Sequence, residues 1–183
     1  TAGQQVTDVF TYEADGGATS TLTITVTGLG PLAANDTVAV NEDATVTGDG
    51  YSDDTTNDGV IENDDDGGAS YESEHSSLRV TQAKPDGGSY TSVSSGGSAN
   101  ISGTYGTLTL YSTGQYSYTP NNTTAQAITK DATVTETFVY EIMDDADVNA
   151  STANLVFTIT GLNDDITAVD DTDSVDEGTS VIR

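Results

Sequence analysis

Cysteine is absent from the 183-residue chain, which excludes disulfide bonds, thiolate metal sites and cysteine nucleophiles. Lysine and arginine together number only 4, against 30 aspartate and glutamate residues. The formal net charge of −26 makes nucleic acid and anionic membranes unfavourable partners, and it makes divalent cations the natural complement. In an extracellular domain without disulfides, we expect calcium to serve as the cross-link.

Long apolar segments and a secretory leader are also missing from the sequence. No hydrophobic run approaches the roughly 18 residues of a membrane-spanning helix, so we expect no membrane insertion. Because the sequence opens inside a repeated pattern, we expect it to be an excerpt of a longer chain. The hydrophobic content of 34% is still enough to bury a core, which predicts a folded domain rather than a disordered tail.

Signals for catalysis are weak. His75 is the single histidine, and its segment YESEHSS is typical of a solvated side chain rather than a catalytic base. Pairs of carboxylates are common, but none occurs in a recognisable pocket context that would separate a glycosidase acid pair from a cluster of metal ligands. We therefore expect no enzymatic activity.

An internal repeat organises the residues that are present. Residues 134–164 contain two alternating segments, 134–142 and 154–160, each followed by an acidic turn. The same pattern occurs near the start of the chain, where Val6, Phe10, Tyr12 and Gly28 stand for Val134, Phe138, Tyr140 and Gly161. Near the end, AVDDTDSVDEGTSV echoes the earlier AANDTVAVNEDATV. The period is about 133 residues, so one whole repeat is present between two fragments.

The repeat divides the chain into three predicted parts. Residues 1–32 read as the C-terminal strands of a preceding repeat, residues 33–164 as one complete repeat, and residues 165–183 as the N-terminal strand of a following repeat. The strands at 1–29 need a packing partner, because two strands alone are marginally stable in water.

The fold class predicted from the pattern is all-β. β-branched residues alternate with apolar ones and no helical periodicity is sustained, which favours a Greek-key β-sandwich with about seven strands. TVAVNEDATV, residues 37–46, is predicted to be the first strand, and a hairpin is predicted across Ser112–Gly114. A Gly/Ser-rich stretch at 87–103 suggests a hairpin with bulges or a flexible tip, and a helical turn is expected near Gln126. The candidate core residues are Tyr105, Leu108, Leu110, Tyr116, Tyr118, Phe138, Tyr140, Leu155, Phe157 and Ile159.

The acidic loop at 53–66 is the most specific local signal. Seven acidic residues lie within residues 50–69, and a calcium ion needs roughly six to eight hard oxygen ligands. In a calcium-loop reading, Asp54, Thr56 and Asp58 converge on the ion, Gly59 makes the sharp turn, Val60 offers its carbonyl, Ile61 anchors the loop in the core, and Asp65 closes it at the twelfth position. The alternative is a solvated acidic loop without a ligand.

A second set of acidic residues falls at the ends of predicted strands. A sandwich gathers strand ends at its two poles, and crowded carboxylates repel one another unless a cation bridges them. Calcium at the repeat boundaries is therefore predicted, with a plain charged linker as the alternative. The residues concerned are Glu42, Asp144, Asp145, Asp147, Asn163, Asp164, Asp170 and Asp171. Of these, Asp144, Asp145, Asn163 and Asp164 are expected to face one joint between repeats.

Several segments together resemble a known family. ISGTYGTLTLYSTGQYSYTP, TVTETFVYEIMDDAD and LVFTITGLND resemble the VCBS repeat, which occurs in tandem in very large bacterial surface proteins, including RTX adhesins secreted by type I systems. VIENDDD at 60–66 is similar to that family's VLANDxD motif. The turns are also similar to cadherin repeats, and this resemblance implies a sandwich of the immunoglobulin or cadherin-like kind. The resemblance implies interdomain calcium ligands at Glu42, Asp145, Asn163, Asp164 and Asp171, and ligands within the domain at Asn63, Asp64 and Asp66. This motif and the calcium-loop reading share Asp64 and Asp65 in different registers.

The resemblance and the composition together predict a calcium-stabilised extracellular spacer, or extender, repeat of a giant bacterial adhesin or surface fibre. Its partners would be the neighbouring repeats, its cofactor Ca²⁺, and its location the bacterial cell surface. One alternative is an adhesin module that binds a glycan or peptide through the loops at 50–76 and 86–100. Another is a self-assembling fibre subunit in which residues 1–29 donate strands to another copy.

Overall fold

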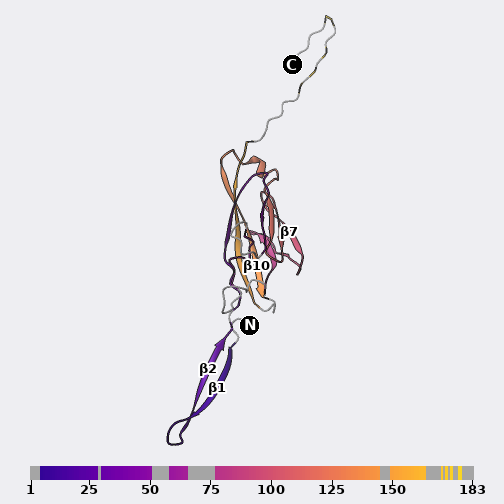
Figure 1. Ribbon diagram of the computed structural model, residues 1–183. Helices are drawn as coiled ribbons and strands as arrows, with labels where there is room; N and C mark the ends of the chain where they lie inside the picture. The colour runs from indigo at the N-terminus through magenta and orange to yellow at the C-terminus, as the bar shows by residue number, and fades with distance from the viewer. Residues whose placement is uncertain are drawn as a thin grey trace.

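The computed structural model describes residues 5–28, 30–50, 58–65, 77–144 and 149–163, and the single positions 170, 172, 174, 177 and 178. Within these residues the chain is all-β (Figure 1). Two sheets pack face to face as a β-sandwich, and a two-stranded hairpin projects from one end of it. The described segments contain no helix with the length and apolar character needed to cross a membrane.

One layer of the sandwich is a five-stranded sheet with the order β3-β11-β10-β5-β6. Its strands are β3 (Asp36–Asn41), β5 (Leu78–Pro85), β6 (Thr91–Ser92), β10 (Thr133–Asp144) and β11 (Ala150–Thr160). β3 runs parallel to β11, and the other neighbours are antiparallel. Every second side chain along the middle of β10 and β11 is buried, as expected for strands with one face on a core.

The other layer is a four-stranded antiparallel sheet with the order β4-β9-β8-β7. Its strands are β4 (Val46–Gly48), β7 (Ser98–Ser102), β8 (Thr107–Tyr111) and β9 (Tyr116–Thr119). β8 and β9 form the hairpin predicted across Ser112–Gly114, and Gly114 adopts the positive φ of +84° that favours glycine in such turns. One turn of 3-10 helix, η2 (Ala125–Ala127), leads into β10.

Aromatic side chains from the two sheets form the centre of the core. Tyr118 of β9 stacks on Phe157 of β11 with ring centroids 4.1 Å apart, and it meets Phe138 of β10 edge-on at 5.8 Å. Tyr116 packs edge-on against Phe157 at 5.8 Å. These rings join residues that are far apart in the sequence, and they connect the two layers at the centre of the core.

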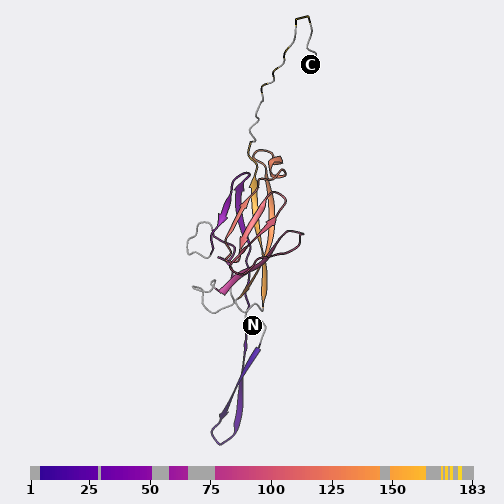
Figure 2. The ribbon, with the colours of Figure 1, turned by 90° about the vertical axis from the view of Figure 1, so that its right-hand side faces the viewer.

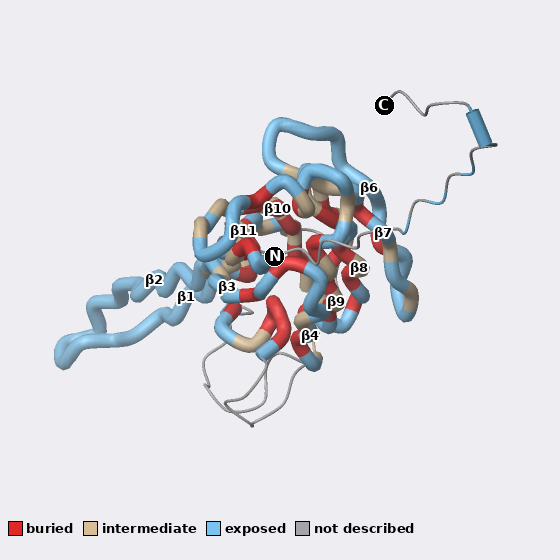
Figure 3. Tube along the Cα trace, turned by 90° about the horizontal axis from the view of Figure 1, so that it is seen from above, coloured by how far each residue is buried: buried red, intermediate tan, exposed pale blue. Residues whose placement is uncertain are grey.

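The hairpin of β1 (Gln5–Glu13) and β2 (Thr19–Thr27) lies outside the sandwich (Figure 2). All of its residues are exposed, whereas the buried residues gather between the two layers of the sandwich (Figure 3). Its apolar residues Val6, Phe10 and Leu22 therefore face solvent, each at least 49% exposed.

The direction of β3 relative to β11 defines two poles. Asp36 pairs with Leu155 and Asn41 with Thr160, so both strands begin at one end, here called the proximal pole, and finish at the other, the distal pole. The chain passes from β2 into the sandwich at the proximal pole and leaves β11 at the distal pole (Figure 1). Successive domains joined in this way would follow one another end to end.

The structure confirms several expectations from the sequence. The all-β sandwich, the hairpin at Ser112–Gly114 and the helical turn near Gln126 are all present. Nine of the ten candidate core residues are buried, and Tyr105 is partly buried against them. The Greek-key connectivity stays a prediction.

Two predictions about strands were wrong. Residues 37–46 do not form one strand, because the chain turns at Glu42–Asp43, where Asp43 has a φ of +61°, and crosses from the five-stranded sheet to the other sheet. The Gly/Ser-rich stretch 87–103 is likewise not one hairpin. β6 pairs with β5 in one sheet, and β7 pairs with β8 in the other.

Candidate cation site

A short turn at residues 58–65 is held tightly against the proximal pole. Val60 and Ile61 are buried, and the Val60 amide donates to the Gly114 carbonyl at 3.0 Å. The turn also pairs with the incoming chain, since the amides of Leu32 and Asp65 each donate to the other residue's carbonyl, at 2.6 and 3.0 Å. This part of the acidic loop is therefore fixed by the core and by backbone hydrogen bonds.

Two glycines allow the turn to sit this close. A Cβ on Gly59 would lie 1.9 Å from the Asp49 carbonyl oxygen, and a Cβ on Gly114 would lie 2.8 Å from the Ile61 side chain. Gly59 was predicted as the residue of a sharp turn. The structure shows that it is needed because backbone atoms approach it closely.

Carboxylates from two distant segments meet at this pole. Asp36 is the first residue of β3, Asp64 lies in the 58–65 turn, and the Tyr140 hydroxyl reaches both from β10. The hydroxyl oxygen is 3.0 Å from Asp36 Oδ2, and 3.3 and 3.4 Å from the two oxygens of Asp64. It is also 2.7 Å from the Ala34 carbonyl oxygen and 2.9 Å from that of Val60. We call these five oxygens and the hydroxyl the carboxylate cluster.

The carboxylate cluster has more acceptors than donors. A phenol has one hydrogen to donate, so the Tyr140 hydroxyl can serve only one of the five oxygens at a time. The Ala34 amide supplies a further donor to Asp64 Oδ1 at 2.7 Å. Buried oxygens that lack a donor are costly, and two carboxylates side by side add electrostatic repulsion. An additional positive charge, either a proton or a cation, would therefore stabilise the cluster.

Both carboxyl groups are difficult to ionise where they lie. Burial raises the pKa of Asp36 to about 7; the nearby Asp64 and Asp58 carboxylates also raise it, while hydrogen bonds from Tyr140 and Asn63 act against them. Burial likewise raises the pKa of Asp64 to about 7, opposed by hydrogen bonds from the Ala34 amide and from Tyr140. The same surroundings raise the pKa of the Tyr140 hydroxyl, which therefore stays protonated.

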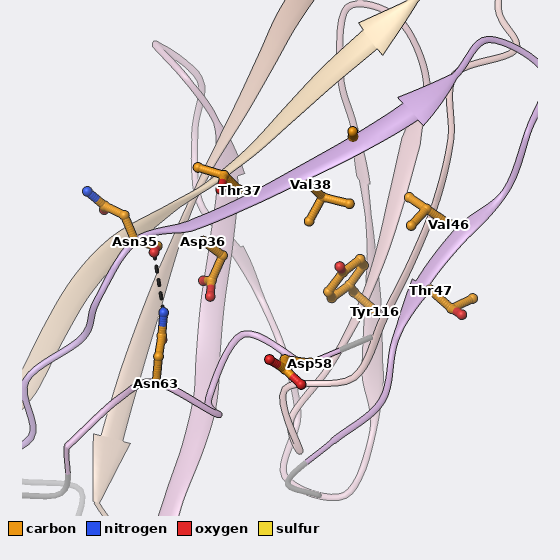
Figure 4. Close-up of a pocket in the computed structure, with 10 residues that line it drawn as sticks. Asn35, Asp36, Thr37, Val38, Val46, Thr47, Asp58, Asn63 and Tyr116 are labelled. Carbon is orange, nitrogen blue, oxygen red and sulfur yellow. Dashed lines mark hydrogen bonds between the residues drawn. The ribbon is translucent and has the colours of Figure 1, made fainter. Parts of the chain in front are cut away.

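A cavity of about 490 Å³ opens beside the cluster, between β3 and β4 (Figure 4). Asn63 donates to the Asn35 carbonyl at 3.3 Å and stands next to the Asp36 carboxylate (Figure 4). Burial raises the pKa of Tyr116, which lines the inner wall, to about 12, with Asp36, Asp58 and Asp49 contributing. The lining residues are Asn35, Asp36, Thr37, Val38, Ala39, Val46, Thr47, Asp58, Asn63 and Tyr116.

The donor set of this pole suits a hard cation. Carboxylate, amide and backbone carbonyl oxygens are the ligands that calcium prefers, and no sulfur or imidazole is present among them. Only two carboxylates belong to the cluster, and within the described residues no three acidic or histidine side chains form a ready-made metal-binding group. A cation here would have to draw Asp58 or Asn63 inward toward Asp36 and Asp64.

The distal pole carries a second buried carboxylate. Glu42 is fully buried, and its Oε1 accepts a hydrogen bond from the Leu162 amide. Its Oε2 is buried and has no hydrogen-bond partner among the residues that the structure describes. An orphaned carboxylate oxygen at a domain end is what a bridging cation would satisfy.

The structure divides the predicted ligands between the two poles. Asp58, Asn63, Asp64 and Asp65 lie in the proximal turn, and Asp144 ends β10 at the same pole. Glu42 and Asn163 lie at the distal pole, so Asp144 and Asn163 do not face the same joint. Further predicted ligands lie outside the described residues: Asp54, Asp66, Asp145, Asp164 and Asp171.

The two registers proposed for the acidic loop differ over Asp64 and Asp65. Asp64 is buried, and its carboxylate faces Tyr140. Asp65 is exposed, and its backbone pairs with Leu32. The arrangement favours the register in which Asp64 points inward, which is that of the VLANDxD-like motif.

Asp36 and Tyr140 were not among the predicted site residues. Tyr140 was predicted as core because of its alternation, and its ring is indeed buried. A signal for Asp36 did exist, because the repeat aligns it with Asp171, which was predicted as a ligand.

No protein-family model matches the chain, and no curated protein matches it in sequence.

Proposed function

We propose that the chain is a calcium-stabilised extracellular spacer repeat of a giant bacterial adhesin or surface fibre. The observation that carries this proposal is the carboxylate cluster, in which five oxygens from four residues surround one hydroxyl. The repeat pattern of the sequence and the positions of the two poles support the spacer role, because domains of this kind can follow one another in line.

Asp36 and Asp64 would hold the cation at the proximal pole, together with the carbonyl oxygens of Ala34 and Val60. Asp58 and Asn63 border the adjoining cavity and would complete the oxygen set. Bound calcium would supply the positive charge that the cluster lacks. In that state Tyr140 would keep its hydrogen for one carbonyl, and both carboxylates would remain ionised near neutral pH.

Glu42 would serve the distal pole. Its Oε1 holds the Leu162 amide, which fixes the chain as it leaves β11. Its second oxygen would complete a site with groups from the following repeat. A cation shared in this way restricts the angle between domains, so calcium would stiffen the string of repeats as well as stabilise each domain.

Calcium titration by calorimetry tests the binding part of this proposal. We expect saturable binding of calcium, a weaker response to magnesium because its smaller shell demands stricter geometry, and loss of the proximal site in Asp64→Asn. Asp131→Asn is the matched control, since the Asp131 side chain is exposed and its carboxylate lies 3.8 Å from the Lys130 ammonium. Titrations that show no calcium binding to the parent chain contradict the proposal.

Scattering tests the spacer part. A chain with two complete repeats should have a longer and narrower distribution of interatomic distances in calcium than in chelator. An unchanged distribution would mean that calcium does not fix the joint, even if it binds within each domain.

A ligand-binding role is the second candidate, and the cavity between β3 and β4 is the observation in its favour. Its mixture of Asp, Asn and Thr with Val and Tyr suits a small polar molecule such as a sugar. A glycan screen with and without calcium separates the candidates. Binding that is lost in Thr47→Trp while calcium stabilisation persists would favour the ligand-binding role.

A further inference from the structure

The β1–β2 hairpin has an apolar face that no other part of the described chain covers. Seven large apolar side chains are between 44% (Ile24) and 65% (Val6) exposed. Six of them share one face of the hairpin, namely Val6, Phe10, Tyr12, Leu22, Ile24 and Val26, whereas Val9 pairs with Thr23 on the opposite face. A lone two-stranded hairpin is marginally stable in water, and exposed faces of this kind mark a missing partner.

The hairpin repeats the strand pairing of β10–β11 without a shift. Phe10 pairs with Leu22 as Phe138 pairs with Leu155. The 9 pairs from Gln5↔Thr27 to Glu13↔Thr19 match, in order, the 9 consecutive pairs from Thr133↔Thr160 to Glu141↔Thr152. Register fixes which side chains share a face, so the hairpin presents the same pattern as the centre of the five-stranded sheet.

In the sandwich, the equivalent strand pair β10–β11 is covered by neighbouring strands and by the second sheet. β10 and β11 lie between β5 and β3, and the four-stranded sheet packs over their inner face. Phe138 and Leu155 are fully buried there. Their counterparts Phe10 and Leu22 are 49% and 52% exposed. The residues are alike and the pairing is alike, so the difference between the two copies is the absence of covering strands.

The acidic residue on this face of each strand pair also indicates a missing partner for the hairpin. Glu136 is buried in the sandwich, where it accepts hydrogen bonds from the amides of Thr104 and Tyr105 and from the Tyr118 hydroxyl. Asp8 occupies the equivalent position in the hairpin. An acid on an otherwise apolar face is expected only where a partner brings donors to it.

We propose that β1–β2 is the central strand pair of a second sandwich of the same design. Its covering strands would be those of an upstream repeat, equivalent to residues 33–132 of this chain. This inference rests on the tandem-repeat part of the proposed function and not on its calcium part. A second copy of this chain is a poorer partner, because its own β10–β11 already fills the position and is covalently attached to it.

The inference is tested with an extended chain in which a second copy of residues 33–132 precedes residue 5. Hydrogen exchange is then compared between the parent and the extended chain, using peptides that cover 5–27 and 133–160. In the parent, the hairpin should exchange freely while β10–β11 is protected. In the extended chain, exchange of the hairpin should slow by about 100-fold or more, toward the rate of β10–β11.

Phe10→Asp in the extended chain is the control, and it should return the hairpin to fast exchange without altering the 133–160 peptides. Fast exchange of the hairpin in the unsubstituted extended chain would overturn the inference. So would protection of the hairpin in the parent chain that grows with protein concentration, because the partner would then be a second copy. Calcium stabilisation of residues 33–163 is measured separately, so failure of either proposal can be told from failure of the other.

Discussion

The Tyr140 hydroxyl oxygen lies 3.0 Å from Asp36 Oδ2, although the two residues are 104 positions apart and their strands are separated by β11. The long side chain of Tyr140 passes beneath β11 at the proximal pole and meets the first residue of β3. The contact links two strands of one sheet, β10 and β3, to the 58–65 turn, since the same hydroxyl also reaches Val60 and Asp64. The geometry of this pole therefore depends on one hydroxyl.

Removing that hydroxyl should destabilise the sandwich. Tyr140→Phe leaves the carbonyls of Ala34 and Val60 without a shared donor, and we expect it to lower the free energy of unfolding in chelator by about 1–3 kcal/mol. Tyr111→Phe is the control, because Tyr111 is 41% exposed and should change stability by less than about 0.5 kcal/mol. Denaturant titration measures both. Equal effects of the two substitutions would argue against a special role for the Tyr140 hydroxyl.

Stability in chelator should fall as the pH rises toward 7. Burial raises the folded-state pKa values of Asp36 and Asp64 to about 7, from an ordinary value of 3.8. The folded state therefore holds protons that the unfolded state has released, and this contribution is fully present below about pH 4 and is lost as the pH rises through about 7. Calcium should bind more tightly over the same range, because it needs the ionised carboxylates.

The Asp36→Asn, Asp64→Asn double variant tests the origin of that pH dependence. Its melting temperature in chelator should vary less between pH 5 and pH 7 than that of the parent chain. Asp131→Asn should keep the parent profile, which controls for the general effect of a net charge of −26. If the double variant and the control follow the same curve, the pH dependence arises elsewhere.

The two copies of the strand pair should respond differently to the same truncation. Phe138→Ala removes a fully buried ring and should cost about 3–5 kcal/mol. Phe10→Ala removes a ring that is 49% exposed, and in this chain it should cost less than about 0.5 kcal/mol. Calorimetric unfolding compares them. A large loss of stability with Phe10→Ala would show that the hairpin packs on the sandwich in solution.

Glu42 should behave as a charge that is costly without a cation. Glu42→Gln keeps an oxygen for the Leu162 amide and removes the buried charge, so its melting temperature in chelator should equal or exceed that of the parent chain. Glu42→Ala should lower it, because the Leu162 amide loses its acceptor. Thermal unfolding of the parent chain and of both variants in chelator measures these differences. A glutamine variant as unstable as the alanine variant would mean that the charge itself stabilises the cation-free protein.

Alternation in the sequence was sufficient to predict the elements whose two faces differ. Phe138, Tyr140 and Phe157 were expected to be buried because they recur at every second position, and the hairpin at Ser112–Gly114 followed from its turn residues. Ile61 was expected to anchor the acidic loop, and it is buried. Burial at these positions follows from the alternation of side chains along a strand, and the turn follows from the residues within it.

Long-range pairing was the part that the sequence did not reveal. Asp36 meets Asp64 because β3 pairs with β11 in parallel and because Leu32 pairs with Asp65. Neither pairing can be predicted from the spacing of residues in the sequence. Residues 37–46 cross between the sheets at Asp43, which has a left-handed backbone conformation. An acidic turn in the sequence does not reveal which of its residues adopts that conformation. The separation of Asp144 and Asn163 likewise follows from strand direction, which alternation does not encode.

Thermal unfolding of the parent chain and of the Asp36→Asn, Asp64→Asn double variant, each in calcium and in chelator at neutral pH, tests the central claim most directly. Ligand at about 100 times its dissociation constant stabilises by roughly 2.7 kcal/mol, which corresponds to about 5 °C or more in a domain of this size. We predict a rise of that order in the parent chain and a much smaller one in the double variant. Equal melting temperatures of the parent chain in calcium and in chelator would contradict the account.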